Sequence, residues 1–530
     1  MTRRRLAGPG SYAWRRVAPT ALAAILAAAY VIVSPPSLDL AAHLLRAKLF
    51  STEGFGIWNN WWYSGHSVVL YSVLFPAAAA VLTPQVAAAL AVVGSAALFE
   101  PLAHRHFGPD AWVGALWFGA ATAVSLYTGR LTFAFGMLPA VATALALDRG
   151  RPGIAAALAL LTALCSPVAA LFAGLVGAAT AIGAFGGRRR GARVWPGVAV
   201  VIAAAIPVGL LALAFPEGGS EPFALSAFWP LPLIGLGLAL VAPRRERILA
   251  AGIVLYVVGT TVSFAVSSAI GSNADRLAEL VAGPLAALLL WPRRRVLLAL
   301  AAVPLLYLQW HAPIRDVSNA GGPAMTSSYY RPLLSFLARQ SGPPFRLEIP
   351  FTKFHWEAYA VAPRFPLARG WERQLDIRYN HLFYDGTLTS ASYERWLHTN
   401  AVRFVAVADA PLDYSAVGER ALIARHPPYL HLVLRSHHWE VFAVRNATPI
   451  VQGDARLDQI GPNGLLLTGQ RPGSALIRIH FTPYWAITAG TGCVAPAGDF
   501  TELTLRRAGT VRLSIRFSLG RIGAHSPRCT

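Results

Sequence analysis

The amino-acid sequence predicts a polytopic α-helical membrane protein of about eleven transmembrane helices, followed by a C-terminal extracytoplasmic α/β plus β-sandwich region. Two observations carry this fold class. Of the 530 residues, 55% are hydrophobic and only 13% are charged, whereas soluble domains carry about 25% charged residues. Residues 1–310 contain only 10 of the 25 acidic residues, whereas residues 311–530 have a mixed composition. A purely soluble enzyme is disfavoured, and the high hydrophobicity excludes a disordered chain.

The first half contains a series of apolar segments, and a transmembrane helix needs about 20 largely apolar residues. The candidate spans are 17–34, 85–103, 110–128, 131–148, 153–166, 167–187, 195–215, 228–242, 248–270, 277–291 and 296–310. The stretch 153–187 is counted as two short helices that break at Ser166-Pro167, because both its flanks are basic and must lie on one side of the membrane.

Segment 67–83 is also apolar, and whether it crosses decides the orientation of everything after it. Basic residues collect on the cytoplasmic side of a membrane protein. If the segment does not cross, that side receives 18 basic residues and the outer side 4; if it crosses, the numbers are 7 and 15. We therefore expect a half-inserted or interfacial helix interrupted at Pro76. The protein is then a multi-pass plasma-membrane protein with a cytoplasmic N-terminus and an extracytoplasmic C-terminal region.

This topology divides the chain into four parts. They are a basic cytoplasmic N-terminus at 1–16, a transmembrane domain at 17–310 with a long outer loop at 35–84, an α/β domain at 311–445, and a β-sandwich-like domain at 446–530. In the α/β part, ASYERWLHTNAVRFVAVAD predicts a helix, a tight turn at Asn400 and a strand. In the last part, short alternating runs such as ALIRIHF and VRLSIRFS predict a sandwich. Cys493 and Cys529 both lie there and are disulfide candidates outside the cytoplasm.

The first outer loop opens with three polar residues at helical spacing. Asp39, His43 and Arg46 are spaced i, i+4, i+7, which places them on one face of a helix covering about 40–50. They can present a carboxylate, an imidazole and a guanidinium to one substrate. The alternative is structural: Asp39 caps the helix, and the other two form its solvated stripe.

Cations are scarce on the predicted outer side, which draws attention to Arg130 in YTGRLTF and Arg276 in GSNADRLAEL. A guanidinium at the headgroup level can bind a phosphate bidentately. The alternative for both residues is snorkelling to lipid phosphates. In the same way, the aromatic cluster Trp58, Trp61, Trp62 and Tyr63 has two interpretations. Such residues anchor proteins at membrane interfaces or stack on sugar rings, and His66 and Tyr71 follow them at a turn.

The segments SLDLAAHLLR, WNNWWYSGHS and LYSVLFP resemble the glycosyltransferase C (GT-C) superfamily, polytopic enzymes that use polyprenyl-phosphate-linked sugars. The later segments TGRLTFAFGMLP, LCSPVAALF and SNADRLAELVAGP look like those of bacterial, especially actinobacterial, members with a C-terminal outer domain. The resemblance covers about residues 17–310.

The resemblance implies transfer of a sugar from a polyprenyl-phosphate carrier to an envelope acceptor on the outer face. An acidic residue in the family's first outer loop acts as general base or positions the acceptor, and Asp39 matches it. The second acid that family members often have is absent, because Leu38 and Leu40 flank Asp39. An arginine in a late outer loop binds the donor phosphate in some members, and Arg276 is the nearest match.

These considerations give Asp39 as the catalytic candidate. The candidate substrate- and donor-binding residues are His43, Arg46, Trp62, His66, Tyr71, Arg130 and Arg276. The expected partners are membrane lipid, a polyprenyl-phosphate sugar and an envelope glycan or lipid acceptor. Nucleic acid is not expected, because the net charge of +21 comes mainly from arginines, which in the first half lie in short runs between apolar segments. A divalent metal is left open, although no DxD motif or histidine cluster demands one.

Two other functions are compatible with the sequence. A multi-pass transporter of a lipid or saccharide is disfavoured because charges lie at span ends and no internal repeat is visible, whereas transporters tend to have repeated halves and buried ionisable residues. A non-catalytic envelope scaffold would be favoured if Asp39 tolerated replacement.

Overall fold

The computed structural model describes residues 10–185, 190–244, 246–291 and 293–530. Most of the predicted basic N-terminus, up to residue 9, lies outside the described residues, as do Arg188, Arg189 and Arg245. The chain divides into two compact units. The first consists of Met1–His43, Tyr71–Leu210 and Ser220–Ala320, and the second of Leu44–Leu70, Leu211–Gly219 and Gly321–Thr530. The second unit therefore contains two short pieces of the first half of the sequence.

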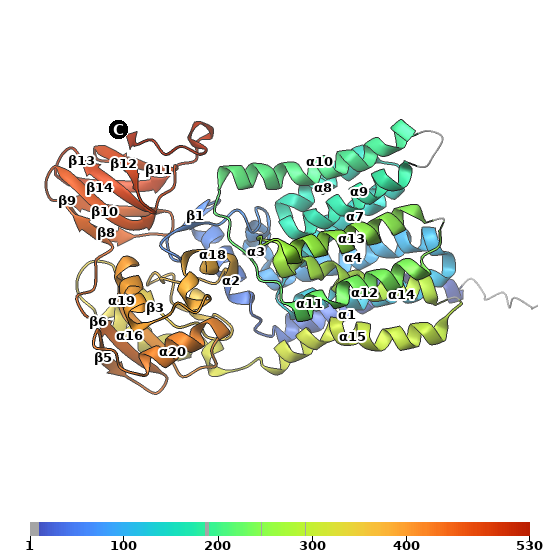
Figure 1. Cartoon of the computed structure of the whole chain (residues 1–530), viewed down its shortest axis with the longest axis horizontal. Coiled ribbons are helices and arrows are strands. Elements are labelled where there is room, and N and C mark those ends of the chain that lie inside the picture. Colours follow the sequence, from blue (N-terminus) through green and yellow to red (C-terminus); the bar gives the residue numbers. More distant parts are fainter. Residues whose placement is uncertain (1–9, 186–189, 245, 292) are drawn as a thin grey trace, which may run out of the picture. The chain divides into compact units, whose positions relative to one another are not determined.

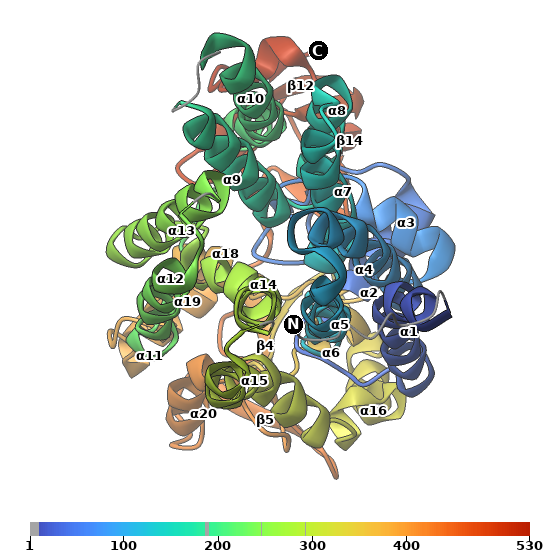
Figure 2. The same cartoon turned by 90° about the vertical axis from the view of Figure 1, so that its right-hand side faces the viewer.

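The first unit is helical, and its long helices run roughly parallel to one another (Figure 1) and are seen almost end-on in Figure 2. The helices that belong wholly or partly to this unit are α1 (Gly10–Val33), α2 (Leu40–Glu53), α3 (Phe75–Leu82), α4 (Pro84–Phe107), α5 (Trp112–Thr122), α6 (Val124–Tyr127), α7 (Leu131–Asp148), α8 (Pro152–Cys165), α9 (Pro167–Ala184), α10 (Arg190–Ala214), α11 (Leu225–Phe228), α12 (Pro230–Val241), α13 (Arg247–Ala265), α14 (Arg276–Leu290) and α15 (Arg295–Ser318). The unit boundaries fall inside α2 and inside α10.

Seven segments of the described chain are long and apolar enough to cross a membrane. They are Ala13–Val33, Pro84–Tyr127, Leu131–Asp148, Pro167–Ala184, Val194–Ala214, Arg247–Ala265 and Arg295–Ser318. This part of the chain thus has the helices of a multi-pass membrane protein. Each of the eleven predicted spans contains a helix, but α8 has only 14 residues and α12 only 12, short of the roughly 20 that a full crossing needs. Helix length therefore supports seven crossings and leaves the count of eleven open.

Prolines set two of the helix boundaries. Ser166 adopts an extended conformation, its Oγ caps α9, and Pro167 occupies the first turn, so the break expected at Ser166-Pro167 is present. The expectation of a helix over 67–83 interrupted at Pro76 is wrong. The helix α3 begins at Phe75, and Pro76 lies in its first turn, where the missing N–H of proline has no partner to lose. At eight residues, α3 is only about 12 Å long.

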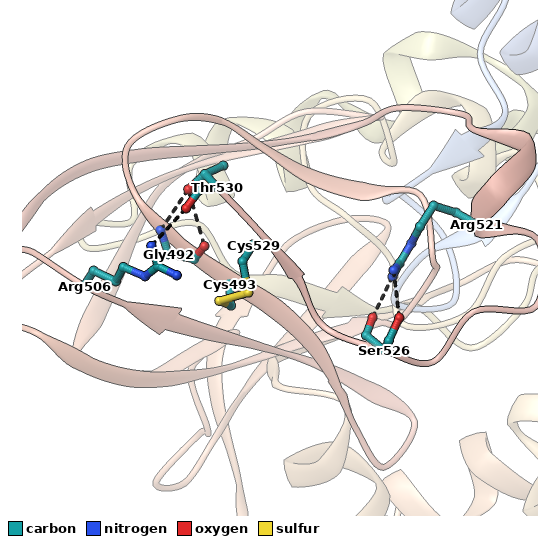
Figure 3. Close-up of a disulfide and its surroundings, with 7 residues drawn as sticks. All are labelled: Gly492, Cys493, Arg506, Arg521, Ser526, Cys529 and Thr530. Atoms are coloured by element: carbon teal, nitrogen blue, oxygen red, sulfur yellow. Dashed lines mark hydrogen bonds between the residues drawn. A yellow bond between two sulfur atoms is a disulfide. The ribbon is translucent and has the colours of Figure 1, made fainter.

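The C-terminal part of the second unit is rich in strands. The last strands form two antiparallel sheets, ordered β15-β12-β13-β10-β7 and β11-β14-β9-β8. Their bounds are β7 (Val451–Gly453), β8 (Ala455–Ile460), β9 (Gly464–Gly469), β10 (Gly473–His480), β11 (Trp485–Ala489), β12 (Gly492–Ala497), β13 (Phe500–Leu505), β14 (Gly509–Ile515) and β15 (Arg528–Cys529). Side chains from both sheets, including Leu467, Ile477, Leu503 and Leu513, form one buried core. A disulfide joins Cys493 of β12 to Cys529 of β15, at paired positions of the two strands (Figure 3).

The part of the second unit that precedes these strands in the sequence is a mixed region with a four-stranded sheet, ordered β3-β4-β6-β5. Its strands are β3 (Arg346–Glu348), β4 (Val402–Ala408), β5 (Leu430–Arg435) and β6 (Trp439–Val444), and its helices are α16 (Ser327–Ala338), α17 (Glu357–Ala360), α18 (Arg373–Tyr379), α19 (Ser390–Thr399) and α20 (Val417–Ile423). The predicted helix–turn–strand is present as α19 and β4. The residue with positive φ in this turn is Ala401, at 53°, one position after the expected Asn400.

The aromatic cluster of the first outer loop belongs to the core of the second unit. Trp58 lies in the core between the two sheets. Trp62 is 1% exposed, and its indole N–H donates to the Ala358 carbonyl at 3.2 Å. Tyr63 donates its hydroxyl to the Glu372 carbonyl at 2.9 Å. Of the two interpretations of this cluster, anchoring at the membrane interface is therefore wrong, because the apolar surfaces are already buried in protein.

Candidate functional site

The structure brings five of the eight predicted site residues into the first unit and places three in the second. Asp39, His43, Tyr71, Arg130 and Arg276 lie in the first unit. Arg46, Trp62 and His66 lie in the second, because the unit boundary falls within α2 after His43. We describe the two groups separately.

In the first unit, a turn at Gly129 packs against the residues around Asp39. Gly129 has a φ of 77°, and a Cβ at this position would lie 2.8 Å from the Cβ of Ser37 and 3.3 Å from the Cβ of Asp39. Only glycine allows this approach and this backbone conformation at once. The turn therefore packs directly against the residue expected to carry the chemistry.

His43 fastens α2 to the same turn. Its Nε2 lies 3.0 Å from the Gly129 carbonyl oxygen, and the side chain is fully buried. The ring lies 5.3 Å from Phe75 and 6.0 Å from Tyr71, centroid to centroid. This packing gives His43 a positioning role beside Asp39 rather than an exposed one.

Arg130 follows the turn and faces several acids. Its guanidinium pairs with Glu279 of α14, and the carboxylates of Asp275 and Asp39 also act on its charge. About one fifth of each side chain of the Arg130–Glu279 pair remains accessible. The ion pair connects the start of α7 to the start of α14 and so brings the two outward arginines of the sequence to one place.

Arg276, the first residue of α14, makes no ion pair or hydrogen bond to any other residue that the structure describes. Its Nε is buried without a hydrogen-bond partner, and the residue as a whole is half-buried. The guanidinium lies 5.6 Å from the centre of the Phe133 ring. Its charge interacts with those of Arg130, Asp39 and Asp275 and with the Tyr71 hydroxyl. A guanidinium that has charged neighbours but no hydrogen-bond acceptor can take an added anion.

Two acids of this cluster were not expected from the sequence. Asp275 precedes Arg276, and Glu279 follows it by three residues, so both lie within one helical turn of it. This spacing was readable in SNADRLAEL. Burial, followed by repulsion from Glu279, raises the pKa of Asp275 to about 7, and its Oδ1 is buried without a hydrogen-bond partner among the described residues. Asp275 is therefore a carboxyl group that can carry a proton near neutral pH.

The predicted residues of the second unit form a separate, closed cluster. Arg46 pairs with Glu372, and the Nε2 of His66 lies 3.7 Å from an oxygen of Glu372. Burial lowers the pKa of His66 to about 4, so its imidazole is neutral at pH 7. Its ring stacks on Trp62 with centroids 5.6 Å apart. Arg46, Trp62 and His66 are therefore all buried beside Glu372, and their substrate-contact role stays a prediction.

Glu217 belongs to the same unit and is buried as well. It accepts a hydrogen bond from the Ser67 backbone N–H, but burial raises its pKa to about 8. The folded chain thus keeps a proton on Glu217 between pH 4.5 and 8 that the unfolded chain has lost, so the free energy of unfolding falls as the pH rises through this range.

We expect Glu217→Gln to remove this pH dependence. The variant should unfold several degrees above the wild type at pH 8 to 9 and at a similar temperature near pH 5, as measured by thermal unfolding of the full chain in detergent. Glu53→Gln, at an exposed position of the same unit, is the matched control and should leave the pH profile unchanged. Parallel profiles for Glu217→Gln and the wild type would contradict the buried proton.

The segment GWERQLDIRYN, residues 370–380, contributes buried and half-buried ion pairs to the mixed domain. Asp376 is fully buried and pairs with Arg369 at 2.6 Å, and Arg373 pairs with Asp413 at 2.7 Å. These ion pairs hold the segment within the mixed domain. In the part of the chain that the structure describes, no group of three His, Cys, Asp or Glu residues could hold a metal ion.

Comparison with protein-family models gave no match to this chain, and comparison with curated proteins gave none either. The site is therefore interpreted from its own residues.

Proposed function

We propose that the chain is an integral membrane glycosyltransferase-like protein, which transfers a sugar from a polyprenyl-phosphate-linked donor to an envelope acceptor on the outer face. The observation that carries the proposal is Arg276, a guanidinium without a hydrogen-bonding partner among the described residues, close enough to Asp39 for their charges to interact. A phosphate is the ligand that an arginine binds best in such a position. A carboxylate beside it supplies the base that a transfer to a hydroxyl needs.

The chemistry assigns one role to each group. The acceptor hydroxyl oxygen attacks the anomeric carbon of the sugar and loses its proton to Asp39. The bond between the anomeric carbon and the phosphate oxygen breaks, and its electron pair leaves with the polyprenyl phosphate. Arg276 stabilises the phosphate charge that develops, which is the kind of electrostatic contribution that lowers such barriers most. The pair of Arg130 and Glu279 keeps Arg130 in place beside it.

The proposal includes a topology. All eleven helical segments named from the sequence cross or enter the membrane, with α8 and α9 forming a pair that turns at Ser166. The N-terminus is cytoplasmic and the C-terminal region extracytoplasmic. Two observations support this orientation. The arginine runs favour it by 18 to 4, and the disulfide between Cys493 and Cys529 suits a compartment outside the cytoplasm.

The proposal predicts a bound lipid that depends on Arg276. We expect the wild-type protein, purified in mild detergent, to carry a polyprenyl phosphate or its glycosylated form, detectable by mass spectrometry of the extracted lipids. Arg276→Ala should lose about tenfold or more of this lipid, since a charge-assisted bidentate contact contributes roughly 1.5–3 kcal/mol. Arg151→Ala, at an exposed position before α8, is the matched control and should carry the wild-type amount.

Equal amounts of the polyprenyl lipid in both variants would contradict the role of Arg276. Bulk phospholipid alone in the wild type and in both variants would contradict the donor class. In that case a transporter or a scaffold would explain the membrane helices better.

A further inference from the structure

A loop near the C-terminus exposes apolar side chains to solvent. It consists of residues 516–527, between β14 and β15, and we call it the C-terminal loop. Phe517 is 49% exposed, Leu519 76% and Ile522 40%. Three large apolar side chains within six residues make a local patch, which a soluble surface normally avoids unless it binds something.

A disulfide and several hydrogen bonds fix the conformation of the loop that carries these exposed side chains. At its far end, β15 is fastened to β12 by the disulfide between Cys493 and Cys529 (Figure 3). Within the loop, the Arg521 guanidinium donates to the Ser526 hydroxyl at 3.0 Å and to the Ser526 carbonyl at 2.7 Å (Figure 3). It also donates from Nε to the Pro483 carbonyl at 3.3 Å.

The base of the loop packs against residues 211–219, the short piece of this unit that contains the last residues of α10. The Tyr484 hydroxyl donates to the carbonyl of Ala214, the last residue of α10, at 2.7 Å. Phe215 lies 5.5 Å from Tyr484 and 6.1 Å from Phe517, centroid to centroid. Residues 211–219 and the C-terminal loop belong to one unit, so these contacts are internal to it.

This packing ties the loop to the end of a candidate membrane span. The candidate span Val194–Ala214 ends where the loop begins its contacts. Leu213, in the last turn of that span, is 68% exposed and suits contact with lipid. At a rise of 1.5 Å per residue, Phe215 is only about 3 Å further along the axis. In a bilayer crossed by this span, the C-terminal loop would lie at the level where acyl chains give way to headgroups.

The charge around the loop suits anionic headgroups. No acidic residue follows Glu502, whereas residues 503–530 contain six arginines. Arg516, which opens the loop, is exposed and makes no ion pair with any residue that the structure describes. Basic residues beside exposed apolar ones are the combination by which protein segments bind the surface of an anionic membrane.

We propose that the C-terminal loop is a membrane-surface anchor. It inserts Phe517, Leu519 and Ile522 into the headgroup region of the same bilayer that α10 crosses, and Arg516 binds anionic headgroups there. The anchor holds the strand-rich domain against the membrane. It rests on the apolar span and the loop alone and is independent of the proposed transferase activity.

A spin label can test the depth of the loop. The full chain, with Cys165→Ala to remove the free thiol, receives a nitroxide at Leu519→Cys and is placed in nanodiscs of phosphatidylcholine and phosphatidylglycerol, with the native disulfide verified by mass. The matched control is Ala508→Cys, exposed in the turn at the other end of β14, roughly 20 Å away along the strand.

We expect the Leu519 label to be several-fold more accessible to oxygen, which concentrates in lipid, than to a water-soluble nickel complex, and the Ala508 label to show the reverse. A Leu519 label as accessible to nickel as the control would overturn the proposal. A label shielded from both reagents would overturn it too, because that result means contact with protein. In nanodiscs of phosphatidylcholine alone the oxygen-to-nickel ratio at Leu519 should fall, and an unchanged ratio would remove the role of Arg516.

Discussion

Replacing Asp39 by Asn should reduce sugar transfer by about 100-fold or more, since general-base catalysis contributes 10²–10⁴-fold. The change is isosteric, so the close packing of Asp39 against Gly129 is kept and only the proton acceptor is lost. The measurement is the rate of transfer in reconstituted vesicles, with the glycosylated lipid recovered by co-purification as the donor. Lipid binding by the variant should stay near that of the wild type, because the phosphate contact belongs to Arg276.

Asp275→Asn offers a matched control within the same cluster. Burial raises the pKa of Asp275 to about 7, so at pH 6 its carboxyl group is mainly protonated, and the neutral amide resembles it. We expect this variant to lose no more than about threefold at pH 6. Normal turnover by Asp39→Asn would remove Asp39 from the mechanism. An equal loss in both variants would show that the cluster responds to any change of its charge, and would contradict a specific base.

Arg369→Met should cause the largest loss of stability. The Arg369 guanidinium is 1% exposed and pairs with Asp376 at 2.6 Å and with Glu419 at 3.2 Å. It lies between the rings of Phe351 and Phe383, at 3.9 and 4.0 Å from their centres. Methionine can fill the space, but it leaves two buried carboxylates without their cation, which costs about 3–5 kcal/mol. We expect the melting temperature of the full chain in detergent to fall by about 10 °C.

The surface pair of Arg435 and Glu440 supplies the control. These side chains are 3.0 Å apart, and Arg435 is 65% exposed, so Arg435→Met should cost less than about 1 kcal/mol. Arg369→Lys keeps the charge but loses the fork that reaches both acids, and its melting temperature should lie between those of the wild type and Arg369→Met. A melting temperature of Arg369→Met within the error of the wild type would contradict the central role of this arginine. If Arg369→Met cannot be purified, the Lys variant still decides the question.

The sequence revealed the helical half and the strands because both depend on local patterns. Apolar length located each helix, and alternation located strands such as β10 and β14. The break at Ser166 was visible from one proline. The outer loop was misread because the fate of Trp58 and Trp62 depends on partners hundreds of residues away, among them Ala358. The sequence pattern of an aromatic cluster is the same whether the cluster contacts lipid or a protein core.

The predicted site residues fall into two separate clusters because their partners, too, are distant in the sequence. Scarcity of outer cations pointed to Arg130 and Arg276, and helix periodicity joined Asp39 to His43. Periodicity also added Arg46 to this set, although it pairs with Glu372 in the other unit. The acids Asp275 and Glu279 lie within one turn of Arg276. Without knowledge of burial, however, acids close to an arginine in a helix are taken for a solvent-exposed face. Spacing along a helix therefore identified which residues share a face of that helix. It could not identify which of the two units each side chain packs into.

The placement of residues 44–70 in the second unit has a consequence for synthesis. This segment leaves the ribosome about 380 residues before the strands that cover Trp58, the first of which begins at Val451. Contacts so distant along the chain form late and fold slowly, and exposed apolar surface invites aggregation while it waits. Trp58 therefore stays uncovered until the last strands are made, and Trp62 and Tyr63 stay uncovered until Ala358 and Glu372 are made. A chain that stops before these partners would keep the aromatic side chains exposed, and such exposed apolar surface promotes aggregation.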